Sequence, residues 1–230
     1  MNLVEQLRER RRAIEAEVAT LAPVRPPRIV CVTKTHPVET VRAAVEAGNR
    51  ELGENYASEL AEKAAALRDL DVRWHFIGHL QRRQIKQVSG AASVVETLSR
   101  VVEAERLAAL GFDGEVFVQV APPDAPATRS GVPREGAPEL VAAARSLGLR
   151  VVGVMGVALP GEEAPVRTFF RSLVALADEL ELPERSFGMS ADWRWATTEG
   201  ATILRLGTAL LGPRPGSRAN LSASEGVEVP

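Results

Sequence analysis

The chain has 230 residues, of which 45% are hydrophobic and 25% are charged, and its formal net charge is −2. This composition is typical of a soluble globular protein and lacks the excess of basic residues that favours nucleic acid or an anionic membrane surface. The single cysteine, Cys31, excludes an intrachain disulfide, no apolar run approaches the roughly 20 residues of a membrane span, and the charged first residues are unlike a signal peptide, so we expect a cytoplasmic protein.

The first predicted element is an amphipathic helix ahead of the main fold. Its apolar residues recur at helical spacing and are Leu3, Leu7, Ile14, Val18 and Leu21. The prolines of APVRPP end the segment, because proline removes a backbone donor and cannot continue a helix. We interpret the RERRR run within it as a solvated helix face.

From residue 28 onward, strand-like segments alternate with helical segments. The strand-like segments are RIVCVTK, RELGE, RWHFIG, SVVETL, EVFVQV, RVVGVMGV, RSFGMS and ATILRLG. About eight such units are typical of a closed (β/α)₈ barrel, although an open, doubly wound sheet gives the same alternation. Strand count and chain length favour the barrel, as a single domain over residues 1–212. A polar tail over residues 213–230, rich in Gly, Pro and Ser, is predicted to be disordered.

Lys34 stands at the end of the first strand-like segment. In both candidate architectures the carboxyl ends of the strands carry the functional site. Side chains alternate along a strand, so Val30, Val32 and Lys34 share one face. Lysine is seldom buried without a partner, and burial lowers its pKa toward the neutral amine that attacks an aldehyde or ketone. Lys34 is therefore a candidate Schiff-base residue; the alternative is a lysine that extends into solvent.

The last two strand-like segments end in small and hydroxyl-bearing residues. SFGMS and LRLGT place Ser190, Gly207 and Thr208 where a barrel commonly binds phosphate. Glycine lets the backbone approach an anion and hydroxyls donate hydrogen bonds to it, although the same residues are also ordinary turn formers. Arg205 shares strand parity with Gly207, which predicts that both face the same way. The alternative for Arg205 is a structural ion pair with Glu54 or Asp192.

Several motifs in matching order, VTKTHP, ELGENYASEL, WHFIGHLQ, GMSADW and ILRLGTALLG, closely resemble the pyridoxal phosphate homeostasis proteins, also called proline synthase co-transcribed homologues. These are relatives of the barrel domain of alanine racemase, and the resemblance runs from about Arg28 to Gly212. It implies a TIM barrel of the alanine racemase N-terminal domain type, here with an extra N-terminal helix. It also implies a monomer that binds pyridoxal phosphate reversibly, buffers it, passes it to apoenzymes and influences amino-acid and keto-acid balance.

The resemblance assigns roles to individual residues. The residues that it implies for cofactor binding are Lys34, Asn55, His75, Met189, Ser190, Arg205, Gly207 and Thr208. Lys34 would form the internal aldimine, the serine, glycine and threonine would bind the phosphate with the methionine beside it, and the asparagine and histidine would line the pocket. Arg205 would face the pyridine nitrogen, where a permanent cation disfavours ring protonation and makes the ring a poorer electron sink.

The chain departs from the family pattern at three basic residues. Arg82 and Arg83 replace a usual Asn-Lys pair, and Arg129 stands where a lysine is common. We expect these changes to alter surface charge and partner contacts rather than cofactor binding. His75 and His79 have a spacing that suits a metal ion only on a helix, and WHFIGH is predicted as a strand, so we expect no metal site.

Three functions remain open from the sequence. A barrel without the second domain that gives alanine racemase its opposing base is expected to exchange its cofactor and to catalyse poorly, because efficient catalysis depends on excluding water. This favours a carrier. The first alternative is a small racemase or lyase of amino acids that uses the same Lys34. The second is a regulatory scaffold whose partners bind the helical shell.

Overall fold

The computed structural model describes residues 1–22, 24–126 and 128–213. In these ranges eight parallel strands pair in sequence order, and β1 also pairs with β8, which closes the barrel. The strands are β1 (Arg28–Val32), β2 (Glu51–Glu54), β3 (Arg73–Phe76), β4 (Val94–Leu98), β5 (Glu115–Val120), β6 (Arg150–Gly156), β7 (Glu184–Ser186) and β8 (Ile203–Leu206). The barrel prediction is confirmed and the open sheet is wrong.

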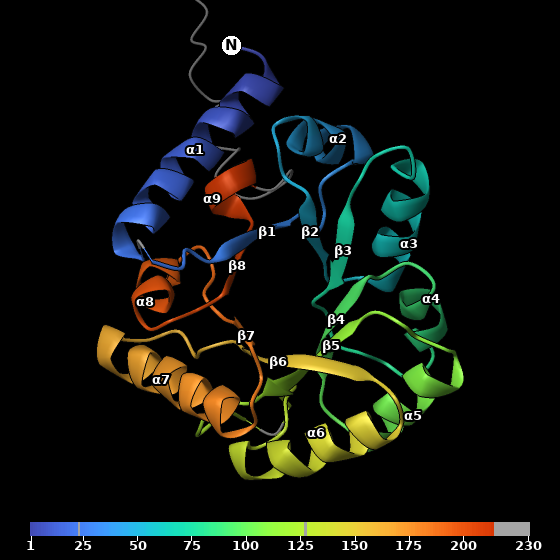
Figure 1. Cartoon of the computed structure of the whole chain (residues 1–230). Coiled ribbons are helices and arrows are strands. Elements are labelled where there is room, and N and C mark those ends of the chain that lie inside the picture. The colour runs from blue at the N-terminus through green and yellow to red at the C-terminus, as the bar shows by residue number, and fades with distance from the viewer. Residues whose placement is uncertain (23, 127, 214–230) are drawn as a thin grey trace, which may run out of the picture.

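Helices follow the strands and surround the barrel (Figure 1). They are α2 (Val38–Glu46), α3 (Ala57–Ala66), α4 (Ile85–Ser89), α5 (Val101–Ala109), α6 (Ala137–Ser146), α7 (Glu163–Glu179), α8 (Trp193–Thr198) and α9 (Thr208–Leu211), with a 3₁₀ turn at Arg134–Gly136. No helix in the described ranges is both long and apolar enough to cross a membrane. The tail predicted to be disordered lies, apart from Pro213, outside the described residues.

The additional helix α1 (Leu3–Leu21) precedes the barrel, as predicted. A capping box starts it: the Asn2 side chain accepts from the Glu5 N–H, and the Glu5 carboxylate accepts from the Asn2 N–H. Its buried face packs against α2, α8 and α9 and consists of Leu7, Ile14 and Val18. Because α2 follows β1, and α8 and α9 precede and follow β8 in the sequence, α1 packs against helices from both sides of the point where β1 pairs with β8 to close the barrel (Figure 1).

Alternate residues of the strands enter two separate apolar layers. Inside the barrel lie Val30, Val94, Phe117, Met155 and Ile203. The opposite strand faces, including that of Cys31, join the helices in the larger core between barrel and shell. Each fully buried aliphatic or aromatic side chain stabilises the fold by about 1.5–3 kcal/mol relative to exposure. The inward face of Val30 agrees with the parity predicted for the strand that precedes Lys34.

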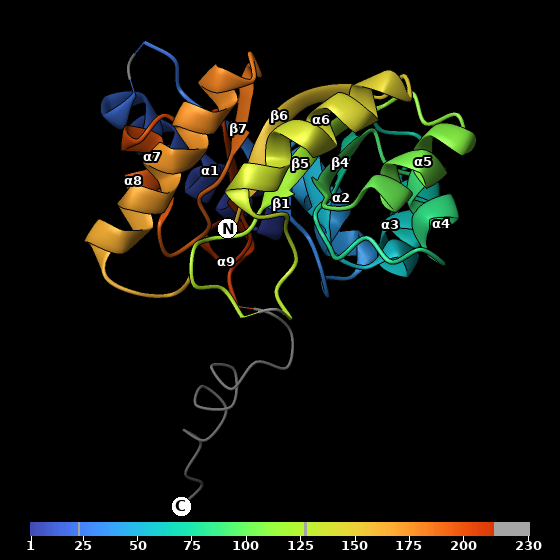
Figure 2. The ribbon, with the colours of Figure 1, turned by 90° about the horizontal axis from the view of Figure 1, so that it is seen from below.

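Two strands, β1 and β7, end earlier than the sequence predicts. β1 ends at Val32, because the chain turns at Thr33, whose carbonyl accepts from the His36 N–H at 3.1 Å. β7 ends at Ser186, and Gly188 has φ +95°, which takes the chain out of the extended conformation. Because the strands are parallel, their following loops lie at one end of the barrel, as the loops after β1, β5 and β6 show in Figure 2.

Candidate functional site

Lys34 lies in a tight turn between β1 and α2. The hydrogen bond between the Thr33 carbonyl and the His36 N–H closes a four-residue turn with Lys34 and Thr35 at its centre. Thr35 has φ 64°, the left-handed conformation that a type II turn requires at this position and that a β-branched residue rarely adopts. The Lys34 side chain is partly buried. The candidate lysine therefore sits on a strained and defined turn.

The predicted phosphate residues lie together beside this turn. The Ser190 hydroxyl accepts from the backbone N–H of Ala209 at 3.4 Å, and Thr208 begins α9 directly after Gly207. A Cβ on Gly207 would lie 3.4 Å from the carbonyl oxygen of Val32, the last residue of β1. The two hydroxyls are on exposed residues. The structure thus brings a hydroxyl pair and a close backbone approach next to the strand that leads to Lys34.

Gly188 explains how the loop after β7 reaches this position. Its φ of +95° is in the region that favours glycine, and a Cβ there would lie 2.5 Å from the Cβ of Ala196. The next residue, Met189, is 36% exposed. Its N–H donates to the Asp192 carboxylate at 2.6 Å. The loop that carries Met189 and Ser190 is therefore fixed by the close packing of Gly188 against Ala196 and by the hydrogen bond to Asp192.

Arg205 is buried inside the barrel, with its side chain 3% exposed. Its Nη1 donates to the Ser186 hydroxyl at 2.6 Å and its Nη2 to the Gly156 carbonyl at 2.8 Å. The carboxylate of Glu96 lies 3.7 Å from Nη1, so the ion-pair partner is Glu96 rather than Glu54 or Asp192. Burial lowers the pKa of Arg205 from its ordinary value, against the opposing effect of the negative charges of Glu96 and Asp192.

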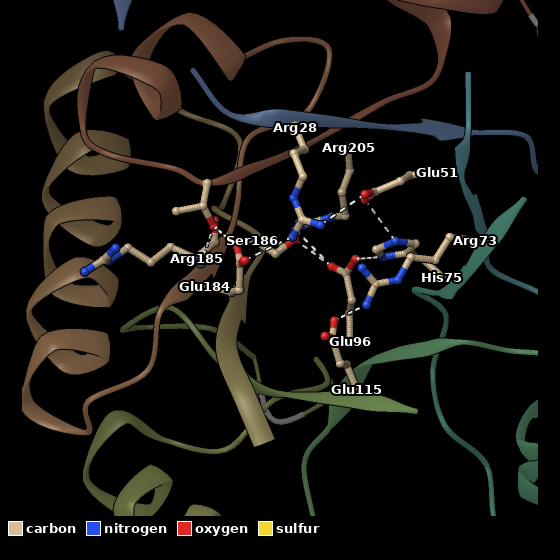
Figure 3. Close-up of polar contacts among 11 residues, drawn as sticks. Arg28, Glu51, Arg73, His75, Glu96, Glu115, Glu184, Arg185, Ser186 and Arg205 are labelled. Carbon is tan, nitrogen blue, oxygen red and sulfur yellow. Dashed lines mark hydrogen bonds and ion pairs between the residues drawn. The ribbon is translucent and has the colours of Figure 1, made fainter. Parts of the chain in front are cut away.

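His75 lies between Glu96, which contacts Arg205, and Glu51, the first residue of β2. Its Nδ1 lies 2.6 Å from Glu96 and its Nε2 lies 3.2 Å from Glu51, and Glu96 also accepts from the Ser186 hydroxyl at 2.6 Å (Figure 3). Burial lowers the pKa of His75, but the two carboxylates raise it by more, so the pKa lies above its ordinary value. His75 is 1% exposed. That it lines a ligand pocket stays a prediction.

Asn55 follows β2 and carries a buried side-chain oxygen, Oδ1, with no hydrogen-bond partner in the described part of the chain. Its backbone is in close contact with Gly78, where a Cβ would lie 1.8 Å from the Asn55 carbonyl oxygen. A buried amide oxygen without a donor is costly. It is therefore available to a ligand that brings an N–H or O–H group.

The remaining sequence candidates lie elsewhere. Arg129 donates to the carbonyls of Val157 and Ala158 at 3.1 and 3.0 Å and thereby joins the loops after β5 and β6. Arg82 and Arg83 are exposed. His79 is exposed, with Nδ1 2.8 Å from the Ser130 hydroxyl.

Sequence reasoning missed Glu96 and Ser186, which join His75 to Arg205. A signal was present for the first, because Glu96 interrupts the apolar run SVVETL and is fully buried in the structure. Ser186 shares strand parity with Gly188, but a serine in a strand carries no comparable signal. Neither pairing can be read from local sequence, since the partners are contributed by different strands.

Comparison with known proteins gives a consistent set of relatives. The sequence model of the alanine racemase N-terminal domain matches residues 10–215. The pyridoxal phosphate homeostasis protein of Aquifex aeolicus is 36% identical over 199 residues, covering 81% of this chain and 87% of the relative. That of Pseudomonas aeruginosa is 36% identical over 217 residues, covering 91% of each.

Solved structures of proteins from the same set of relatives have the same fold as this chain. PipY of Synechococcus elongatus, 29% identical and solved without pyridoxal phosphate, superimposes with a TM-score of 0.81 over 90% of this chain and 100% of that one. The structure of PipY with pyridoxal phosphate bound gives a TM-score of 0.79 at 28% identity. Alanine racemase of Clostridium difficile, 15% identical, shares the fold with a TM-score of 0.72 over 93% of this chain and 58% of its own.

Proposed function

The chain belongs to the family of the alanine racemase N-terminal domain and, within it, to the pyridoxal phosphate homeostasis proteins, and on that premise we propose that it binds pyridoxal 5'-phosphate reversibly and serves in the homeostasis of this cofactor. It buffers a reactive aldehyde and delivers it to apoenzymes, with effects on amino-acid and keto-acid balance. The observation that carries the proposal is the contact of Gly207 with Val32, which brings the hydroxyls of Ser190 and Thr208 beside the Lys34 turn.

The residues present fit the chemical groups of pyridoxal phosphate. The Lys34 amine suits its aldehyde, and the hydroxyls of Ser190 and Thr208, with the backbone at Gly207, suit its phosphate. Arg205 suits the pyridine nitrogen as a cation that disfavours ring protonation. When bound, the cofactor supplies an electrophilic aldehyde and a conjugated ring; the protein's own groups hold the phosphate, orient the ring and set its protonation.

Three further residues take supporting roles in the proposal. The unpartnered Oδ1 of Asn55 accepts a hydrogen bond from the ligand or from water bound with it. Met189 covers the phosphate from the loop after β7. His75 acts on the ring indirectly, because Glu96 and Ser186 connect it to Arg205.

A carrier is favoured over a catalyst by two features of the site. Arg205 at the ring nitrogen weakens the electron sink that carbanion chemistry needs. Ser190 and Thr208 are exposed, which leaves the phosphate end open to exchange. The proposal includes a monomeric protein of the cytoplasm, with apoenzymes that depend on pyridoxal phosphate as recipients.

The test is transfer. Protein loaded with pyridoxal phosphate is mixed with an excess of an apoenzyme that needs the cofactor, and the recovered activity is compared with that from free cofactor. The proposal predicts full recovery in proportion to the loaded protein, whereas Lys34→Ala, purified in the same way, delivers little. In parallel, amino acids labelled at the α-hydrogen are incubated with the loaded protein. Release of the label at a metabolically useful rate would identify a racemase or lyase instead.

A further inference from the structure

Three charged side chains surround the turn that carries Lys34. Lys63 comes from α3 and is 4% exposed, and its Nζ lies 2.7 Å from Glu54 Oε1 and 2.7 Å from Glu59 Oε2. Glu54, at the end of β2, is fully buried, whereas the Glu59 side chain, one helical turn before Lys63, is 27% exposed. An ammonium group and two carboxylates thus form a compact cluster, hereafter the Lys63 cluster.

Each member of the Lys63 cluster contacts the turn itself. Lys63 Nζ donates to the Thr33 carbonyl at 2.9 Å, and the Thr33 hydroxyl donates to Glu54 Oε1 at 2.6 Å. Glu59 Oε2 accepts from the Thr35 N–H at 2.8 Å. The residues immediately before and after Lys34 are therefore both held by side chains of β2 and α3.

The pKa values of the two carboxylates in the cluster are shifted in opposite directions. Burial raises the pKa of Glu54, against the opposing effect of its hydrogen bonds from Lys63 and Thr33. Burial also raises the pKa of Glu59, but its bonds from Lys63 and from the Thr35 N–H lower it by more. Glu59 is thus held in the charged form that accepts the Thr35 N–H.

Fold stability alone does not require this arrangement. Buried ion pairs contribute little net stability compared with a well-packed apolar cluster of the same volume. A left-handed threonine such as Thr35, at φ 64°, persists only where its surroundings determine its conformation. The Lys63 cluster supplies that determination at the turn that bears the candidate nucleophile.

We propose that Lys63, together with Glu54 and Glu59, is a positioning cluster that fixes the Thr33–Thr35 turn and so directs the Lys34 amine toward the aldehyde of the bound cofactor. The proposal rests on the function proposed above, since it assumes that Lys34 is the residue that reacts. Within the described residues, no hydrogen bond or ion pair joins the cluster to the phosphate residues Ser190 and Thr208, so the role proposed for it is specific to the aldehyde end of the ligand.

This specificity gives a test that a general structural role would not pass. Pyridoxal 5'-phosphate and pyridoxine 5'-phosphate share the ring and the phosphate, but pyridoxine phosphate has a hydroxymethyl group in place of the aldehyde. The ratio of their dissociation constants therefore reports the contribution of the lysine–aldehyde bond. We would measure this ratio by equilibrium titration for the wild type, Lys34→Ala, Lys63→Met and Glu59→Ala.

Glu103→Ala is the matched control. Glu103 is the third residue of α5, as Glu59 is of α3, and it also accepts backbone N–H groups, those of Ser99 and Arg100 at 2.9 and 3.1 Å. It lies outside the Lys63 cluster. Because removal of Lys63 leaves a buried carboxylate uncompensated, Glu59→Ala, at a partly exposed site, provides the test if Lys63→Met does not fold.

We expect the preference for the aldehyde ligand to fall about tenfold or more in Lys63→Met and Glu59→Ala, since a small misplacement of a reacting group has a large effect on its reaction. Pyridoxine phosphate should bind these variants as it binds the wild type, and Glu103→Ala should keep the wild-type ratio. Lys34→Ala should lose the preference altogether.

Two results would overturn the proposal while leaving the proposed function intact. One is a wild-type ratio in both cluster variants, with the preference lost in Lys34→Ala. The other is an equal weakening of both ligands in the cluster variants, which would indicate a structural role only. A preference that survives in Lys34→Ala would instead show that Lys34 is not the attachment residue, and the proposed function would fail with it.

Discussion

The two ends of the barrel interior use polar groups in opposite ways. At the amino ends of the strands, charged side chains pair with one another: Arg28 with Glu51 and Glu184, and Arg73 with Glu115 (Figure 3). At the carboxyl ends, the hydroxyl-bearing residues Ser190 and Thr208 are exposed, and the buried Oδ1 of Asn55 has no partner in the described ranges. A polar group that is satisfied by a neighbour stabilises the fold, whereas one left unsatisfied is available to a ligand.

Between the two ends, His75, Glu96 and Ser186 form a continuous set of contacts that reaches Arg205. Arg205 is thus held by Ser186 and by the carboxylate of Glu96, so its orientation does not depend on a bound ligand. A side chain that is already ordered in this way does not have to be ordered when a ligand binds, which lowers the free-energy cost of binding. Substitutions among the paired charges should therefore change the stability of the fold, whereas substitutions among the exposed groups at the carboxyl ends should change ligand binding.

The largest effect is expected from Glu96→Leu. This change leaves His75 and Arg205, two buried groups, without their shared carboxylate, and removing one partner of a buried pair costs about 3–5 kcal/mol. Urea unfolding should report a loss of that size. Glu62→Leu, the same substitution at an exposed position of α3, should change the free energy of unfolding by no more than about 0.5 kcal/mol. Equal losses for the two variants would contradict the paired-end account.

Next in size is the double variant Ser190→Ala with Thr208→Val. Each hydrogen bond to a charged group contributes about 1.5–3 kcal/mol, and the exposure of both hydroxyls favours the low end of that range, so loss of the two bonds should weaken the binding of pyridoxal phosphate about 100-fold. The melting temperature without ligand should stay near that of the wild type, because both residues are exposed. Absorbance titration measures the first quantity and calorimetry the second. Ser58→Ala, an exposed serine of α3, is the control, and an unchanged affinity in the double variant would remove the phosphate assignment.

A smaller change in the free energy of unfolding is expected when the pH is varied. The pKa of His75 in the folded protein lies above its ordinary value of 6.5, because the neighbouring carboxylates of Glu51 and Glu96 outweigh burial. The protonated ring therefore stabilises the fold fully below about pH 6.5, and this contribution is lost as the pH rises through the folded pKa. The difference in unfolding free energy between the wild type and His75→Gln should fall over that range. A difference that does not change with pH would show that the ring is not charged.

No reaction with a thiol reagent is expected in the native protein at Cys31, three residues before Lys34. Its side chain is fully buried, and burial raises the pKa of the thiol to about 12. Native protein at pH 8 should therefore resist a maleimide reagent, whereas unfolded protein should react, as intact mass spectrometry would reveal. Rapid labelling of the native protein would show that the closed core does not extend up to the Lys34 turn.

Much of the fold could be predicted from sequence because its signals are local. The eight strands follow from apolar runs, and the inward parity of Val30 follows from alternation along a strand. Gly207 and Thr208 were found for the same reason, since they directly follow β8. The exact strand ends were not, because a single turn at Thr33 and the positive φ of Gly188 shorten β1 and β7.

The supporting residues could not be predicted because their partners are distant in sequence. Glu96 meets Ser186 only when the barrel closes, 90 residues later in the chain. Lys63 lies in an ordinary helical pattern, and nothing in ASELAEK indicates that its amine reaches the carbonyl of Thr33. The structure adds to the sequence the contacts that hold a site in place, whereas the sequence already indicated most of the groups proposed to touch a ligand.

The central claim is that Lys34 holds pyridoxal phosphate at the open end of the barrel. The most direct measurement is to load the protein with the cofactor, reduce with borohydride, and locate the modified residue by peptide mass spectrometry, with Lys34→Ala treated in parallel. The account predicts one stoichiometric adduct on Lys34, together with a visible absorbance band that the variant lacks. An adduct elsewhere, or none in protein that is fully folded, would contradict it.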